Sequence, residues 1–321
     1  MTAGRSEPGA QAARRRISAD EEGQRLDNYL ARLLRGVPRS RLYSMLRRGE
    51  VRVNGSRAAP SRRLQAGDEL RLPPVRLPPP AAAAAPGAGL LRQLEERILH
   101  EDRALLVVNK PAGLASHGGS GLECGLIEAL RALRPEHEFL ELCHRLDRDT
   151  SGCLIVAKGR AALRGLHEQF RQRRIAKRYL ALVAGSWERR LHRLEAPLRR
   201  RRLPSGELRV EVSFRAGEPS ATAFEIVQAF GTATLLAAMP RTGRTHQIRV
   251  HCAYARHPVG NDDKYGDERF NAELQARGLR RMFLHAQRIA FEDPRSGRLL
   301  KIEAPLDQEL QRILSLYQAS S

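Results

Sequence analysis

Residues 143–152, with the sequence CHRLDRDTSG, hold the densest group of side chains capable of chemistry. Two carboxylates, Asp147 and Asp149, alternate with arginines, and an apolar run at 153–157 follows directly. A tight charged loop beside a strand can hold a carboxylate at a working position, because a neighbouring arginine favours the charged form of the acid. An ordinary polar turn with internal salt bridges would have the same pattern. The loop therefore suggests a reactive carboxylate without deciding between a site and a turn.

Two further stretches contain polar groups that could serve the same site. The segment 241–251 (RTGRTHQIRVH) has three arginines and two histidines, which can bind phosphate, orient a base or pair with a carboxylate. A solvated helix start would look similar. In 177–183 (KRYLALV), strand alternation places Lys177, Tyr179 and Ala181 on one face, where a tyrosine is more often part of a core. No single stretch establishes a site.

The elements that must position these stretches show no regular alternation of strand and helix. Apolar runs predict strands at 105–108, 153–157, 179–183, 223–227 and 234–238. Helical spacing predicts helices at 160–173 and 246–255. An α+β fold with a mixed sheet is therefore favoured over a doubly wound one.

Composition and charge narrow the class of partner. The chain has 321 residues, with 56 lysines and arginines against 36 acidic residues, for a formal net charge of +20. Such a surplus favours a polyanion, and without a membrane-length apolar run or a signal-type start, nucleic acid is the better candidate. The four cysteines have no CxxC pairing, which indicates reduced thiols in a cytoplasmic protein, and no His/Cys cluster has zinc-ligand spacing.

The chain divides by composition into four pieces. Residues 1–17 are rich in Gly, Ala and Arg without periodicity, which predicts a disordered basic tail. In 18–75, two short helices are followed by small strands, one of which enters a tight turn at Asn54-Gly55. Proline and alanine dominate 76–95, which predicts a linker, and 96–318 forms the larger domain.

In this order, the motifs resemble the RluA family of pseudouridine synthases. The loop at 144–152 is similar to the family signature, and so is GRTHQIR at 243–249. The resemblance continues through Asn109-Lys110-Pro111, Lys177-Arg178-Tyr179-Leu180, Asp263-Lys264-Tyr265-Gly266 and Leu284-His285-Ala286.

Two further features indicate which branch of the family the sequence resembles most. The module at 18–75 resembles an S4 RNA-binding domain, and 117–122 and 166–169 look closest to the C-type branch, which modifies large-subunit (23S) ribosomal RNA. The resemblance implies an α+β protein: a small S4 domain and a larger catalytic domain on a mixed, largely antiparallel sheet.

Residue roles follow from the matched motifs. Asp147 matches the catalytic Asp, Tyr179 the active-site Tyr, and Arg244 the Arg expected to pair with Asp147. Arg145 matches a residue that enters the RNA as the target base leaves, while Asp149 is expected to be structural or to bind an arginine of the loop. The other residues expected to contact RNA are Arg25, Arg39, Arg41, Arg47, Arg52, Asn54, His144, Lys177, His246 and Arg249.

The implied reaction converts specific uridines of 23S ribosomal RNA to pseudouridine. Asp147 would attack or deprotonate the ribose to break the N1–C1′ bond before the base rejoins through C5. Isomerisation involves no redox change, so neither a cofactor nor a metal is expected. The expected partner is large-subunit RNA or an assembling subunit, and a monomer is the default. Alternatives are a transfer RNA or other rRNA substrate, a non-catalytic S4-type RNA-binding protein, or an RNA glycosidase or nuclease using both loop carboxylates.

Overall fold

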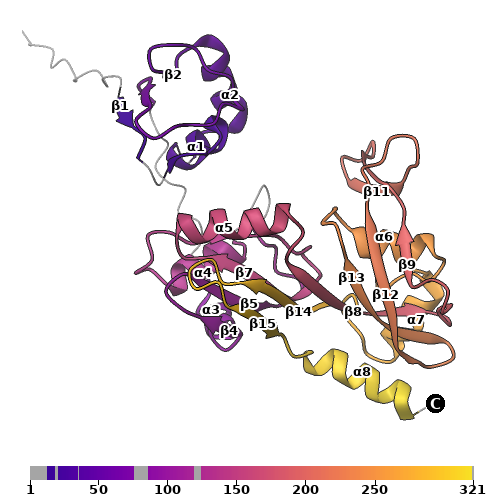
Figure 1. The fold of residues 1–321 in the computed structure, drawn as a ribbon. Helices are drawn as coiled ribbons and strands as arrows, with labels where there is room; N and C mark the ends of the chain where they lie inside the picture. Colours follow the sequence, from indigo (N-terminus) through magenta and orange to yellow (C-terminus); the bar gives the residue numbers. More distant parts are fainter. Residues whose placement is uncertain (1–12, 19–20, 35, 76–85, 119–123, 320–321) are drawn as a thin grey trace, which may run out of the picture. The chain divides into compact units, whose positions relative to one another are not determined.

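The computed structural model describes residues 13–18, 21–34, 36–75, 86–118 and 124–319. The chain forms two compact units, one within residues 1–84 and one within 85–321 (Figure 1). Within the described ranges, no helix has both the length and the apolar character needed to cross a membrane.

The N-terminal unit packs two helices on a three-stranded antiparallel sheet of order β1-β3-β2. Its elements are β1 (Ala13–Arg16), α1 (Leu26–Leu33), α2 (Arg39–Arg48), β2 (Arg52–Val53) and β3 (Glu69–Leu72). Gly49 ends α2 at a φ of 69°, a left-handed conformation that glycine adopts without a steric penalty. Asn54 and Gly55 both have positive φ, 51° and 77°, which confirms the predicted tight turn after β2.

The boundaries of two predicted pieces differ from the structure. Residues 13–16 were expected in the tail but form β1, which pairs with β3, and Ile17 is buried beside them. Part of the predicted linker is also folded, because α3 (Ala88–Glu95) buries Leu94 against the larger unit's core. The rest of the predicted tail, 1–12, and of the linker, 76–85, lies outside the described residues.

The larger unit is built on a ten-stranded sheet. Its strands are β4 (Ile98–Glu101), β5 (Leu105–Lys110), β6 (Glu141–Leu142), β7 (Ser151–Ala157), β8 (Ala176–Ala184), β9 (Arg193–Glu195), β12 (Ala221–Ala229), β13 (Ala233–Pro240), β14 (Leu284–Glu292) and β15 (Leu299–Glu303). The order is β4-β5-β7-β14-β8-β13-β12-β9, with β15 beside β14 and β6 beside β7. Among the described strands, only β7 and β14 pair in parallel. The α+β, largely antiparallel prediction is therefore confirmed.

Helices cover both faces of this sheet. They are α4 (Leu126–Leu133), α5 (Arg160–Arg171), α6 (Gln247–Tyr254), α7 (Glu268–Ala276) and α8 (Gln308–Ala319). Alternate residues of β5 and β7 pack against α3 and α4 on one face and against α5 on the other. Further along, β8 and β13 pack against α6 on one face and against α7 and α8 on the other. A separate hairpin, β10 (Leu198–Arg202) and β11 (Leu208–Val212), extends beyond the sheet (Figure 1).

The central strands bring the three predicted stretches together. The acidic loop leads directly into β7, Tyr179 lies on β8, and Ala238 of β13 pairs with Tyr179 just before the 241–246 loop. Gly152 allows β7 to approach β14 closely. Its φ is 111°, and a Cβ there would lie 2.3 Å from the carbonyl oxygen of Ala286.

Candidate active site

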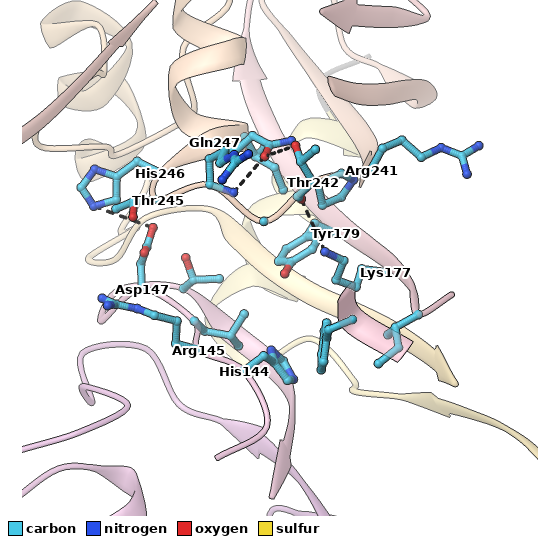
Figure 2. A pocket seen from close by; sticks show the side chains of 18 of the residues that line it. His144, Arg145, Asp147, Lys177, Tyr179, Arg241, Thr242, Thr245, His246 and Gln247 are labelled. Atoms are coloured by element: carbon cyan, nitrogen blue, oxygen red, sulfur yellow. Dashed lines mark hydrogen bonds and ion pairs between the residues drawn. The ribbon is translucent and has the colours of Figure 1, made fainter. Parts of the chain in front are cut away.

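A cavity of about 530 Å³ lies where these three stretches meet. The acidic loop forms one wall, β8 the floor, and the 241–246 loop with the start of α6 the opposite wall (Figure 2). Asp147, Tyr179 and His246 all line it, together with Arg145, Lys177, Arg244 and Arg249. Strands distant in the sequence have therefore assembled a single polar pocket.

Two side chains, one from α6 and one from the residue before it, lie next to the Asp147 carboxylate. One of its oxygens, Oδ2, lies 3.8 Å from Arg249 Nη1 and 3.9 Å from His246 Nε2. The Asp147 side chain is 19% exposed, whereas that of Arg249 is only 3% exposed. Water therefore screens the charge of the arginine poorly.

Arg249 is itself fixed by a buried partner. Its Nε and Nη2 donate to the two carboxylate oxygens of Asp262, both at 2.6 Å, in a bidentate pair. Burial alone lowers the pKa of Arg249, but the hydrogen bonds and charge of Asp262 outweigh it and raise the pKa overall. The arginine is therefore a permanent cation beside Asp147.

Lys110 fixes the backbone of the acidic loop by hydrogen bonds. This fully buried ammonium donates to the carbonyl oxygens of Pro111 and Leu114 at 2.8 Å and of Arg148 at 2.9 Å. Burial lowers the pKa of Lys110 to about 7, while the nearby loop carboxylates act in the opposite direction. Because three carbonyls match the three donors of an ammonium group, Lys110 fixes the backbone next to Asp147.

A second network fixes the start of β7. The Nε2 of His285 lies 3.0 Å from the Ala304 carbonyl, to which it must donate, so Nδ1 accepts from the Ser151 hydroxyl at 2.7 Å. Arg281 in turn donates to Ser151 Oγ at 2.6 Å. The strand that follows the acidic loop thus starts from a fully hydrogen-bonded position.

Tyr179 and Lys177 occupy the floor, on the same face of β8 as predicted. Burial, and secondarily the charge of Asp147, raises the pKa of Tyr179, so its phenol stays protonated at neutral pH. Burial lowers the pKa of Lys177 to about 8, and its Nζ lies 3.5 Å from the Thr242 carbonyl oxygen.

Arg244 does not make the expected pair with Asp147. It lies on the exposed loop before α6, pairs with Glu218, and donates to the Pro219 carbonyl at 3.3 Å. The arginine next to Asp147 is Arg249, which α6 carries inward on its buried side. The contact expected of Arg244 is thus made by Arg249 of the same motif in the structure, and a catalytic role for either arginine stays a prediction.

The remaining residues of the acidic loop that were named from the sequence differ in exposure and in their partners. His144 Nε2 accepts the Ile155 N–H at 3.1 Å, and burial lowers the pKa of His144 to about 3, so the neutral ring helps to hold the loop against β7. His144 also lines the cavity, and its RNA contact stays a prediction. Arg145 is exposed at the cavity. Asp149 pairs with Arg148 at 3.0 Å, in line with the structural role expected for it.

In the N-terminal unit, the predicted RNA contacts are of two kinds. The exposed arginines are Arg25, Arg39, Arg41 and Arg47. Arg52 and Asn54 instead bond within their own turn and sheet: Arg52 donates to the Gly49 and Gly55 carbonyls, and Asn54 Nδ2 donates to Asp68 at 2.7 Å. RNA contact by any of the six stays a prediction.

Three features received no role from the sequence. Lys110 and Tyr265 stand in stretches noted for their resemblance, but each has a partner that is distant in the chain, Arg148 for Lys110 and His246 for Tyr265. The run Arg199–Arg202 on β10 was visible as four consecutive arginines, and all four are exposed. Charge clustering alone could have identified this run.

Comparison with known proteins agrees with the site. Residues 104–254 match the family model for RNA pseudouridylate synthase, and residues 24–70 match that for the S4 domain. Ribosomal large subunit pseudouridine synthase C of Pasteurella multocida is 55% identical over 93% of this chain and 91% of its own length. The protein of the same name from Haemophilus ducreyi is 52% identical over 94% of this chain and 95% of its own.

Among solved structures, human RNA pseudouridylate synthase domain containing 4 has the same fold, with a TM-score of 0.59 at 24% identity over 72% of this chain and 96% of that one. The resemblance to the RluA family and its C-type branch is confirmed by the two bacterial relatives. The chain therefore belongs to the RNA pseudouridylate synthase family and contains an S4 domain at residues 24–70.

Proposed function

We propose that this pseudouridine synthase modifies uridines of large-subunit (23S) ribosomal RNA, with Asp147 as the group that attacks or deprotonates the ribose. The observation that carries the mechanism is the position of Asp147, in a polar cavity between the buried cation Arg249 and the protonated phenol of Tyr179. The substrate is inferred from relatives named as large-subunit enzymes.

Two routes from uridine to pseudouridine use one carboxylate. In the first, Asp147 attacks C1′, uracil leaves from N1, and after rotation C5 displaces the carboxylate. In the second, Asp147 removes the C2′ proton as uracil leaves, and that proton returns when C5 bonds to C1′. In both, C5 loses its proton and N1 gains one, so the mass of the RNA is unchanged.

Arg249 and Tyr179 serve this chemistry in different ways. Arg249 stabilises the negative charge on Asp147, the role that the resemblance implied for Arg244. Tyr179 offers an aromatic face for the uracil and a phenol able to move a proton. Arg244, exposed on the neighbouring loop, is placed to meet the RNA backbone.

A second groove, of about 1010 Å³, shares Arg173, Lys177 and Arg241 with the first cavity. Its charged lining consists of six arginines and one lysine against a single glutamate, Glu195. Such a groove suits the phosphates of a strand that continues from the flipped uridine. We expect Arg145, which is exposed at the cavity, to fill the gap that the base leaves.

Tritium release from C5-labelled uridine tests both the reaction and the substrate. We expect the protein to release tritium from unmodified 23S ribosomal RNA, and much more slowly from a transfer RNA transcript at equal uridine concentration. Preferred release from transfer RNA would overturn the substrate assignment. Binding without release from either RNA would favour the alternative of a non-catalytic S4-type protein.

A further inference from the structure

Tyr265 and His246 form a pair beside Asp147 that takes no part in the chemistry above. His246 Nδ1 lies 2.8 Å from Tyr265 Oη, with the two rings edge to face at 5.5 Å. The opposite ring nitrogen, Nε2, lies 3.9 Å from Asp147 Oδ2. Figure 2 shows the imidazole and the carboxylate pointing toward each other across the cavity.

The surroundings of His246 favour one of its two neutral tautomers, because the Asp147 carboxylate on the Nε2 side can only accept a hydrogen bond. Tyr265 Oη accepts the N–H of Val210, on β11, at 2.9 Å, so the phenol proton is free for His246 Nδ1. Nδ1 then acts as acceptor, and the ring proton resides on Nε2, facing Asp147. Burial lowers the pKa of His246, which agrees with a neutral ring.

Tyr265 is itself held firmly. The Arg249 guanidinium lies 5.1 Å from its ring centroid and that of Arg209 5.8 Å, and its backbone N–H donates to Asp262 at 3.1 Å. The phenol is therefore fixed by the same buried ion pair that places a cation beside Asp147.

The backbone of His246 is an independent sign of function. It has φ 53° and ψ 20°, a left-handed conformation that residues other than glycine rarely adopt. Such strain persists where the surroundings impose it, and it concentrates at active sites. Here the strained residue precedes α6 and directs its ring at the candidate nucleophile.

We propose that His246 is a positioning residue for Asp147, held in its orientation by Tyr265; this inference rests on the proposed role of Asp147. His246 and Arg249 both approach the same oxygen, Oδ2. They fix that oxygen from two directions and leave Oδ1 to react with the ribose. The separation of 3.9 Å closes to a hydrogen bond when RNA fills the site, as catalytic contacts commonly tighten in the substrate complex.

The tautomer can be measured without RNA, by ¹⁵N NMR of the histidine rings in the full-length protein at neutral pH. We expect His246 to be neutral with the proton on Nε2, and the Tyr265→Phe variant to lose this preference while keeping the aromatic ring. A proton on Nδ1, or a charged ring in the wild type, would overturn the proposal.

Single-turnover rates at saturating RNA test the positioning role. Tyr265→Phe should lower the rate roughly tenfold, the effect of one lost hydrogen bond near a charge, with RNA affinity nearly unchanged. His246→Asn keeps a residue that tolerates positive φ but cannot reach Asp147, so it should be slower still. His246→Gln restores a neutral N–H donor and should recover part of the rate.

Two kinetic results would overturn the proposal. One is an unchanged rate with weakened RNA affinity in His246→Asn, as for a phosphate contact; the other is a His246→Gln variant no faster than His246→Asn. If wild-type protein releases no tritium from ribosomal RNA, the proposed substrate is wrong, whereas the NMR experiment still tests the Tyr265–His246 pair. The two proposals can therefore fail separately.

Discussion

Replacing Arg249 by glutamine should damage stability and catalysis for different reasons. Arg249→Gln leaves Asp262, 1% exposed, as a buried carboxylate without its cation. Removing one member of a buried ion pair typically costs about 3–5 kcal/mol. Two backbone N–H groups, of Lys264 and Tyr265, still bond Asp262 at 2.9 and 3.1 Å, which favours the lower end of that range. For a unit of this size, about 3 kcal/mol corresponds to a melting temperature lower by roughly 6–12 °C.

A second substitution separates the two effects. In Arg249→Gln/Asp262→Asn, the asparagine oxygen keeps both backbone bonds and its amide can pair with the new glutamine, so most of the lost stability should return. Catalysis should not return. The double variant still lacks the arginine whose Nη1 lies 3.8 Å from Asp147 Oδ2. We therefore expect a single-turnover rate roughly 10²–10³-fold below wild type in the double variant.

Thermal unfolding and single-turnover tritium release on the same preparations provide the assay. Arg244→Gln is the matched control: this exposed arginine should change RNA affinity but not the rate at saturating RNA. If the double variant regained both stability and turnover, Arg249 would act only through folding. If Arg244→Gln alone abolished the rate, the sequence-based assignment would be the correct one.

Three further outcomes are expected. Lys110→Met leaves three carbonyls without their donor, so chemical denaturation should show a free energy of unfolding lower by roughly 2–4 kcal/mol. Turnover should also be slower, because the acidic loop is displaced. Unchanged stability and rate would refute this prediction. Glu101 has a pKa lowered to about 2 by hydrogen bonds from Arg134 and then Lys158, so its stabilising effect is present above its unfolded pKa and is lost as the pH falls through about 2. Glu101→Gln should therefore lower the free energy of unfolding by about 1–2 kcal/mol at neutral pH, allowing for the partial exposure of Glu101. In acid denaturation, the stability of the variant should depend less on pH than that of wild type between roughly pH 4.5 and 2. A pH profile parallel to that of wild type would contradict this prediction. Tyr179→Phe should slow single turnover about 10²-fold with little change in RNA affinity, and an unchanged rate would limit Tyr179 to stacking.

Sequence patterns predicted the larger unit well because its strands and helices carry strong apolar periodicity. β7, β8 and β13 each contain a buried run, and the acidic loop stands directly before one of them. The first strand escaped prediction because all four residues of β1 are exposed, so its pairing with β3 rests on backbone hydrogen bonds and an exposed ion pair between Arg14 and Glu69. A strand without a buried face has no hydrophobic pattern to read.

The arginine beside Asp147 could not be identified by spacing. Arg241, Arg244 and Arg249 stand in one polar stretch, and which of them turns inward depends on where α6 begins. That point is set by the left-handed backbone of His246, a conformation that sequence rules assign to glycine or asparagine. Lys110 presents a similar case: two of its acceptors, Pro111 and Leu114, are close in the chain, but only the folded sheet brings the third, the Arg148 carbonyl, to it.

The most direct test of the central claim compares Asp147→Asn with Asp149→Asn and wild type in C5 tritium release from 23S ribosomal RNA. Asp147→Asn keeps the size of the side chain and the neighbouring contacts but removes its charge. We expect it to bind RNA with wild-type affinity and release no tritium, while Asp149→Asn, whose partner is the exposed Arg148, stays active. Release by Asp147→Asn at a rate close to wild type would contradict the account, because the reaction would then not depend on this carboxylate.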